Sequence, residues 1–238
     1  MSNVGEARKL LDRRVLLAVA ASLLTLGSLG GLFTDRLLAG HRPEFHALRG
    51  LLVADLWRSG ELLPRWVPEL AGGLGYPLFI YYGWLSYAFA AELHVLGMSP
   101  VAALNAVTVA ALLWQAAGAW QLGRVLGGRA GGYVAWALFA FAPYQLMNVW
   151  VRGNYPELVA GSFAPWAFLA MYGTARGRGR FALPACAALL AAILLCHNIS
   201  GLTLGATVVC AGLVFAGTLP PGARLWAAGR VLLAAAAG

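Results

Sequence analysis

The sequence predicts an all-α polytopic membrane protein. Hydrophobic residues make up 61% of the 238 residues, only 11% are charged, and the mean hydropathy is positive. Apolar runs of membrane-spanning length recur along the chain and are separated by short polar breaks. These observations exclude an ordinary soluble domain and indicate a single membrane domain covering residues 1–238.

The first span is predicted at residues 15–34, where Val15 to Phe33 is an uncharged apolar run. Four basic residues precede it: Arg8, Lys9, Arg13 and Arg14. The small residues Ala18 to Ala21 would also suit a secretory signal peptide. However, the run is too long for that, and more spans follow.

Five further spans are predicted within residues 100–219. They are Val101–Gly123, Ala130–Trp150, Leu158–Gly173, Phe181–Cys196 and Gly201–Leu219. Residues 220–238 form a cytoplasmic break followed by the start of a seventh span at Val231. We therefore expect about six complete transmembrane helices in what is the N-terminal module of a longer protein.

Residues 35–99 are predicted to form an external loop with two juxtamembrane helices. The second of these, Tyr76–Gly97, is long and apolar enough to be mistaken for a span. If it crossed, the arginine-rich loops near Arg124 and Arg178 would be external. If it lies on the outer surface, most of the 17 basic residues are cytoplasmic, which the positive-inside rule favours.

The net charge of +8 is explained by this topology and by contact with lipid headgroups, so no nucleic-acid partner is expected. The predicted location is the inner (plasma) membrane, with a cytoplasmic N-terminus. Cys186, Cys196 and Cys210 lie in apolar runs without CxxC spacing and are interpreted as small buried hydrophobic residues.

Three polar breaks would share the outer side in this topology: the long loop, Val151–Glu157 and Cys196–Ser200. In the long loop, Pro43 suits the first position of an amphipathic helix over Pro43–Ser59. Glu44 then falls in the first turn, where the helix dipole favours the ionised carboxylate of a base or metal ligand. Simple solvation of this carboxylate, and of Asp55, is the alternative.

A divalent metal ion is a candidate cofactor, because His41, Glu44 and His46 carry groups that bind zinc or manganese. Their spacing matches no recognised metal motif, so ordinary hydrogen bonding remains open. Arg152 could grip a phosphate with its bidentate fork, or could form a structural ion pair with Glu157. Hydrogen-bond donors at the third break could bind a ligand or cap a tight turn; they belong to His197 and Asn198.

The order of several motifs resembles the bacterial membrane proteins of the GT-C glycosyltransferase superfamily. More narrowly, it resembles the group labelled 6-pyruvoyl-tetrahydropterin synthase-related membrane proteins, a label with no support in these residues. The motifs extend over most of Val15 to Leu219. They are Gly40-His41, Phe45-His46, Ser59-Gly60, Pro64-Arg65-Trp66, Gly75-Tyr76-Pro77-Leu78-Phe79, Tyr81-Tyr82, Tyr87, Ala142-Pro143-Tyr144, Val151-Arg152-Gly153 with Glu157, and His197-Asn198.

The resemblance implies transfer of a sugar from a polyprenyl-phosphate-linked donor at the outer face, with membrane lipids as surroundings. Glu44 would be the acid of the first external loop, Glu157 the second acid, and Arg152 the phosphate ligand. The remaining implied substrate-binding residues are His41, His46, Arg65, Tyr82, His197 and Asn198. Relatives usually carry Asp directly after the Gly-His pair, where this chain has Arg42, so either Glu44 acts as its substitute or the site is altered.

Two other classes of function remain open. One is a non-catalytic membrane subunit that binds a lipid phosphate or supports assembly of cell-envelope polysaccharide. The other is a small-solute transporter, which predicts polar side chains facing each other at mid-membrane. The candidates for such a role lie scattered in one span: Asn105, Thr108, Gln115 and Gln121.

Overall fold

The structure is a computed structural model that describes residues 30–34, 36, 37, 40 and 42–238. Most of the predicted first span, together with His41, lies outside the described residues. Within them the fold is helical and contains no β-strand, which confirms the predicted all-α class. The one extended pairing there is an isolated antiparallel bridge between Val67 and Tyr76.

Among the described residues before residue 100 there are three α-helices, α2 (Pro43–Arg58), α3 (Leu78–Tyr81) and α4 (Leu85–Val95). Short 3-10 helices lie at η1 (Gly30–Leu32) and η2 (Ala71–Gly73). As predicted, Pro43 begins α2 and Glu44 falls in its first turn. α2 packs against α4, and α4 packs in turn against α5, α7 and α8.

The predicted surface segment Tyr76–Gly97 is broken into α3 and α4. α4 is the longer of the two, with 11 residues. At 1.5 Å per residue its length is about 17 Å, well short of the roughly 30 Å of a hydrocarbon core. Neither helix is therefore long enough to be a membrane span, although the hydropathy of the whole segment would suggest one.

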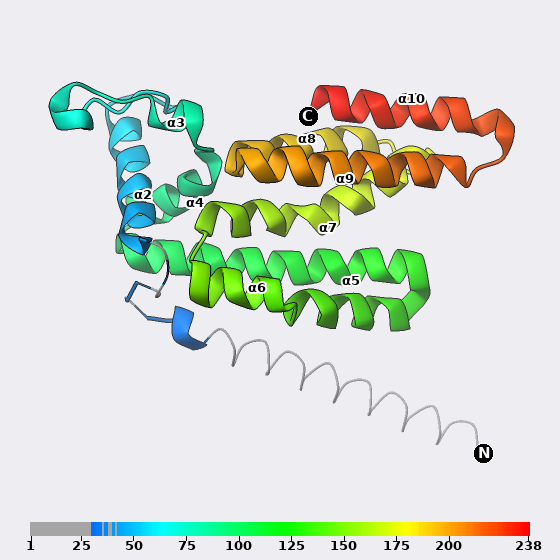
Figure 1. Cartoon of the computed structure of the whole chain (residues 1–238), viewed down its shortest axis with the longest axis horizontal. Coiled ribbons are helices and arrows are strands. Elements are labelled where there is room, and N and C mark those ends of the chain that lie inside the picture. Colours follow the sequence, from blue (N-terminus) through cyan, green and yellow to red (C-terminus); the bar gives the residue numbers. More distant parts are fainter. Residues whose placement is uncertain (1–29, 35, 38–39, 41) are drawn as a thin grey trace, which may run out of the picture.

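Helix α5 (Pro100–Ala140) is a hairpin whose two halves run antiparallel (Figure 1). The chain reverses at Gly127 and Gly128, which have non-helical backbone angles, with φ of +66° at Gly128. The halves touch at their glycines, since a Cβ on Gly131 would lie 2.6 Å from the carbonyl oxygen of Gly123. The predicted runs Val101–Gly123 and Ala130–Trp150 correspond to this hairpin and its continuation.

That continuation consists of α6 (Pro143–Met147) and a π-helical turn, η3 (Asn148–Arg152). Four helices follow in antiparallel order (Figure 1): α7 (Tyr155–Arg176), α8 (Ala182–Cys196), α9 (Asn198–Gly217) and α10 (Pro221–Ala237). α7 is central and packs against α5, α8, α9 and α10. α10 begins at Pro221, before the predicted start at Val231, because proline suits the first position of a helix.

Among the described residues, three helical segments are long and apolar enough to cross a membrane. They are Pro100–Arg152, Tyr155–Arg176 and Asn198–Gly217. α8 is apolar but shorter. The predicted count of about six complete spans and the start of a seventh stays a prediction.

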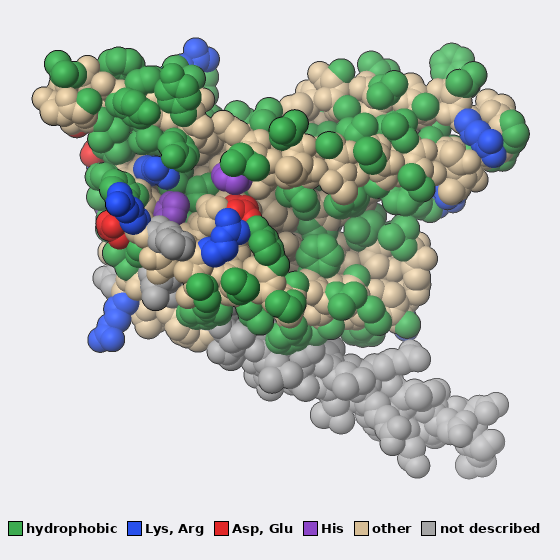
Figure 2. Space-filling view, viewed as in Figure 1, with side chains coloured by type: hydrophobic (Ala, Val, Ile, Leu, Met, Phe, Trp, Pro, Cys, Tyr) green, Lys and Arg blue, Asp and Glu red, His purple; other side chains and the backbone are tan. Residues whose placement is uncertain are grey.

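The bundle has two chemically different ends. At one end lie the turn of the α5 hairpin and the α7–α8 and α9–α10 turns (Figure 1). These turns carry Arg124, Arg129, Arg176, Arg178, Arg180 and Arg224. At the other end, α2, α3 and α4 cover the α6–α7 and α8–α9 connections (Figure 1). Figure 2 shows basic, acidic and histidine side chains gathered there, between the α2–α4 unit and the bundle.

Candidate functional site

The α2–α4 unit is joined closely to both polar connections of the bundle. A Cβ on Gly40 would lie 3.0 Å from the Cα of Gly153, in the α6–α7 connection. A Cβ on Gly83 would lie 2.5 Å from the carbonyl oxygen of Cys196, in the α8–α9 connection. Backbone approaches this close are possible because glycine has no Cβ.

Hydrogen bonds add to these contacts. The Tyr155 hydroxyl donates to the Ser86 carbonyl at 2.8 Å, and the Asn198 amide donates to the Tyr81 carbonyl at 2.9 Å. The three polar breaks therefore meet at one end of the molecule. This is the arrangement that the sequence interpretation required for a shared site.

Arg152 and Glu157 form the first charged cluster of this end. The Arg152 guanidinium donates to both carboxylate oxygens of Glu157, at 3.1 and 3.0 Å. Asn154 and Tyr144 also donate to this carboxylate, and Arg152 donates to the Tyr144 hydroxyl at 2.7 Å. The side chain of Glu157 is 15% exposed and that of Arg152 is 37% exposed. Glu157 is thus saturated, while the guanidinium stays accessible.

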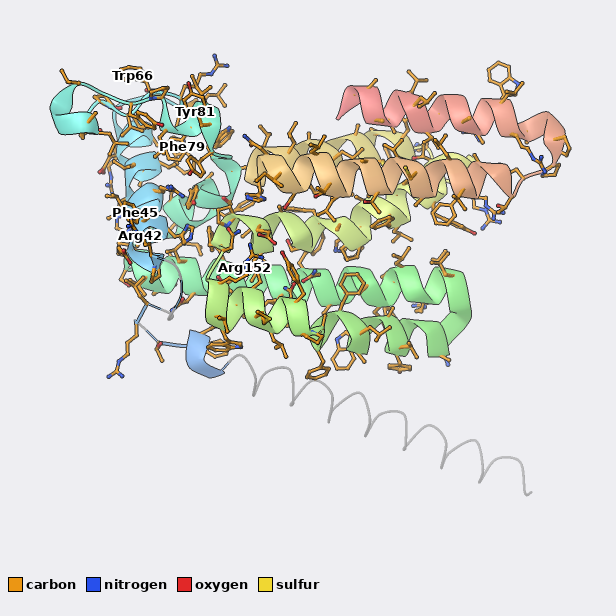
Figure 3. The ribbon with its side chains drawn as sticks, in the orientation of Figure 1. Arg42, Phe45, Trp66, Phe79, Tyr81 and Arg152 are labelled. Carbon is orange, nitrogen blue, oxygen red and sulfur yellow. The ribbon has the colours of Figure 1, made fainter. Side chains whose placement is uncertain are left out.

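The backbone before Glu157 explains how the cluster forms. The π-helical turn η3 ends at Arg152, and Gly153 then adopts a left-handed conformation with φ of +59°. π-Helical turns are uncommon and frequently occur at functional sites. Here the turn places Arg152 beside the first turn of α7, which contains Glu157. Figure 3 shows Arg152 between α6 and α7 at the end of the bundle.

His46, Arg49 and Tyr87 form a second cluster. The Tyr87 hydroxyl lies 2.9 Å from Nδ1 of His46 and accepts a hydrogen bond from Arg49 at 3.0 Å. A further hydrogen bond links His46 to the backbone of Gly153. The Arg49 guanidinium also lies 4.3 Å from the ring centroid of Tyr82, a cation–π distance.

The environment of His46 keeps its imidazole neutral. Burial lowers its pKa from 6.5 to about 4, and the positive charge of Arg49 acts in the same direction. Burial also raises the pKa of Tyr87 to about 12. The ring of His46 forms hydrogen bonds with both Tyr87 and Gly153. The neutral imidazole therefore links α2 to α4 and to the α6–α7 connection.

Glu44 lies on a different side of α2 from His46, because two residues correspond to about 200° around a helix. Its side chain is exposed and makes no hydrogen bond or ion pair with the described residues. No group of three or more His, Cys, Asp or Glu side chains within the described part of the chain could hold a metal ion. The metal hypothesis therefore gains no support from these residues.

His197 and Asn198 lie where the sequence placed them, at the α8–α9 connection. Nδ1 of His197 accepts from the backbone amide of Ser200, which caps the start of α9. Burial lowers the pKa of His197, and the charges of Glu157 and Arg152 have smaller and opposing effects. Both the capping interpretation and a location near the first cluster are therefore observed.

Arg65 is not brought to the site. Its side chain is exposed, and its neighbour Trp66 lies far from Arg152 in Figure 3. Tyr82 does reach the second cluster, through Arg49.

Four contributors were not predicted as site residues: Arg49, Tyr87, Tyr144 and Asn154. Arg49 follows His46 by three residues, a spacing that places both on one helix face, so this signal was available. Tyr87 and Tyr144 were noted only among the residues that carry the family resemblance.

A cleft opens beside the first cluster, between α5, α6, α7 and α9. It holds about 790 Å³ of empty space, part of it open to the surroundings. Tyr144 and Glu157 lie at its charged side. The rest of the lining combines polar and apolar side chains, among them Gln115, Gln145 and Asn148.

The fold and this cluster define a polytopic helical membrane protein with a polar site at one end. Residues 79–221 match the 6-pyruvoyl-tetrahydropterin synthase related domain, which is described as a membrane protein, and the chain belongs to this family. The matched region contains the whole first cluster and Tyr87 of the second cluster. Helix α2, which carries His46 and Arg49, precedes it. No curated protein and no solved structure is significantly similar to the chain.

Proposed function

We propose that the protein transfers a sugar from a polyprenyl-phosphate-linked donor to an acceptor at the outer face of the membrane. The observation that carries this proposal is the accessible Arg152 guanidinium, held in place by Glu157 and Tyr144 beside a cleft between the helices. A permanently charged, oriented fork suits a phosphate. The lipid part of such a donor would remain in the bilayer next to the cleft.

The contacts support distinct roles for the two glutamates. Glu157 has its carboxylate occupied by Arg152, Asn154 and Tyr144, so it suits positioning of the guanidinium better than proton transfer. Glu44 is exposed and has no such partners among the described residues. It is the better candidate to accept a proton from the acceptor hydroxyl. Arg152 would then stabilise the negative charge that develops on the departing phosphate.

A non-catalytic lipid-phosphate-binding subunit is the second candidate. It is favoured by the placement of Glu44 on a different side of α2 from His46. His46 contacts Tyr87 in the second cluster, whereas the exposed Glu44 does not share this contact. Such a subunit would use Arg152 to hold the phosphate and would need no base.

The two functions are separated by Glu44→Gln, with Asp55→Asn as the matched control. Asp55 is an exposed carboxylate of the same helix, paired with Arg58 at 2.7 Å. Purified protein in liposomes would receive a panel of polyprenyl-phosphate hexoses together with a membrane extract as acceptor. Release of polyprenyl phosphate from the donor would be followed by mass spectrometry. Binding of polyprenyl phosphate to the protein would be followed by native mass spectrometry.

For an enzyme, Glu44→Gln should slow release by roughly a hundredfold or more while binding persists and Asp55→Asn behaves as the parent. For a binding subunit, no variant releases product, and Arg152→Gln alone abolishes binding. Polyprenyl phosphate binding that survives Arg152→Gln unchanged would refute both.

The proposed orientation places the arginine-bearing turns in the cytoplasm and the clusters outside the inner membrane, with a cytoplasmic N-terminus. The supporting observation is that these turns share one end of the bundle (Figure 1), as the positive-inside rule favours. In a variant lacking the native cysteines, Leu126→Cys and Arg178→Cys should resist an impermeant thiol reagent in intact cells. Labelling of both from outside would reverse the orientation and refute the shared external site.

A further inference from the structure

The cleft between α5, α6, α7 and α9 is lined by several amide side chains. The Gln145 side-chain amide donates to the Gln115 carbonyl oxygen at 2.8 Å, and Gln115 reaches the backbone carbonyl of Gly161 at 3.4 Å. Asn148 lies one turn after Gln145 and lines the same space. In the sequence Gln115 was one of several scattered polar residues, whereas the fold gathers it with two others.

Asn148 has an unmet hydrogen-bonding requirement. The residue is 2% exposed, and its Oδ1 atom has no hydrogen-bond partner among the described residues. Buried polar atoms are nearly always paired, so each exception requires an explanation. Polar side chains inside a membrane protein are costly and commonly mark a functional site. Asn148 lines this cleft and also the smaller cavity beside His46. Turning its side chain toward the cleft would let a ligand that donates hydrogen bonds supply the missing partner.

The charge of the cleft restricts what this ligand can be. Glu157 is the only ionisable acid or base among the described lining residues apart from the tyrosine Tyr144, and Arg152 neutralises it. No residue that lines the cleft therefore offers an ion an unpaired opposite charge, and Arg152 is not among the lining residues. The amides, together with the hydroxyls of Ser200 and Thr203 on α9, suit an uncharged group with several hydroxyls. The cavity volume of about 310 Å³ lies at the lower end of the range of small-molecule pockets.

We infer that this cleft binds a sugar ring, with the amides of Gln115, Gln145 and Asn148 meeting its hydroxyls. A phosphate attached to that sugar would lie toward Arg152, beside Tyr144 and Glu157 at the edge of the cleft. That the ring belongs to a lipid-linked donor rests on the proposed function. Sugar binding itself does not require turnover and can be tested separately.

The test uses the full chain in lipid nanodiscs and a photoreactive alkyl glucoside as the probe. The matching photoreactive alkanol, which has the same tail and no sugar, reports lipid-like contact with the helices. Crosslinked peptides would be mapped by mass spectrometry. Asn148→Leu and Gln145→Leu remove the proposed partners, and Gln121→Leu is the control because it removes an amide from α5 outside the cleft.

The glucoside should label the cleft-lining parts of α6, α7 and α9, and the alkanol should show no enrichment there. Each cleft variant should reduce glucoside labelling roughly tenfold, the loss expected for one buried hydrogen-bonding partner, while Gln121→Leu leaves it unchanged. Thermal unfolding of each variant verifies its fold. Asn148→Leu should unfold at no lower temperature than the parent, since it removes an unpaired buried carbonyl.

Equal labelling by the two probes, or unchanged labelling of both cleft variants, would overturn the inference and leave the cleft as a lipid groove. Specific glucoside labelling without any release of polyprenyl phosphate would support the sugar site while refuting the proposed transfer. Release of polyprenyl phosphate by both cleft variants at the parental rate would support the transfer and overturn the sugar site.

Discussion

Acidification should destabilise the folded protein through His46. Its pKa is about 4 in the folded state and 6.5 when unperturbed. Because the folded-state pKa is depressed, the unfolded chain binds a proton first as the pH falls. The contribution of His46 to stability is therefore complete above pH 6.5 and is lost as the pH falls toward 4.

The magnitude follows from these two values. At pH 5 the unfolded imidazole is almost fully protonated and the folded one is mostly neutral. The free energy of unfolding should then be about 2 kcal/mol lower than at pH 7, by linkage. His197, whose pKa is also lowered by burial, adds to the loss in the same direction.

The assay compares unfolding of the parent and of His46→Asn in detergent micelles at pH 7 and pH 5. Asparagine keeps a polar group near Tyr87 but does not titrate in this range. We expect the parent to lose about 2 kcal/mol more than the variant on acidification. Parallel pH dependence in the two proteins would show that His46 is not the neutral, buried link described above.

Two further substitutions test how the polar end is assembled. Gly83→Ala places a Cβ 2.5 Å from the Cys196 carbonyl oxygen and should cost about 1–3 kcal/mol of stability. The control is Gly229→Ala in α10, where an added Cβ meets no neighbouring atom within 4 Å, so this change should be neutral or stabilising. Equal effects of the two substitutions in thermal unfolding would contradict the close approach at Gly83. Tyr155→Phe removes the buried hydrogen bond to the Ser86 carbonyl and should cost about 1 kcal/mol of stability. The control Tyr133→Phe changes an exposed tyrosine and should cause no measurable loss of stability. A parental melting temperature for Tyr155→Phe would refute the contribution of that hydrogen bond.

The agreement between sequence and structure is best where the signal is local. Pro43 predicted the start of α2, and the apolar runs after residue 100 correspond to helices of the bundle. The expected reversal between the second and third runs occurs at Gly127 and Gly128. α10 begins earlier than the hydropathy indicated, since a proline-initiated helix can include polar residues such as Arg224.

The candidate site was predicted less completely. Arg152, Glu157, His46 and His197 were identified as candidates, but the contacts that bring the three polar breaks together join residues far apart along the chain. Tyr87 meets His46 across 41 positions, and Asn198 meets Tyr81 across 117. The sequence also left open whether Arg152 pairs with Glu157, and gave no reason to connect Gln115 with Gln145.

Composition and hydropathy alone determined that this chain is a helical membrane protein, because in a bilayer the backbone must satisfy its hydrogen bonds within each helix. The order of polar breaks also determined which segments could meet on one side. Only the tertiary structure decided which side chains do meet. The saturated Glu157, the neutral His46 and the unpaired Asn148 each depend on neighbours from other helices. Burial and hydrogen bonding are properties of that packing, so no local pattern in the sequence contains them.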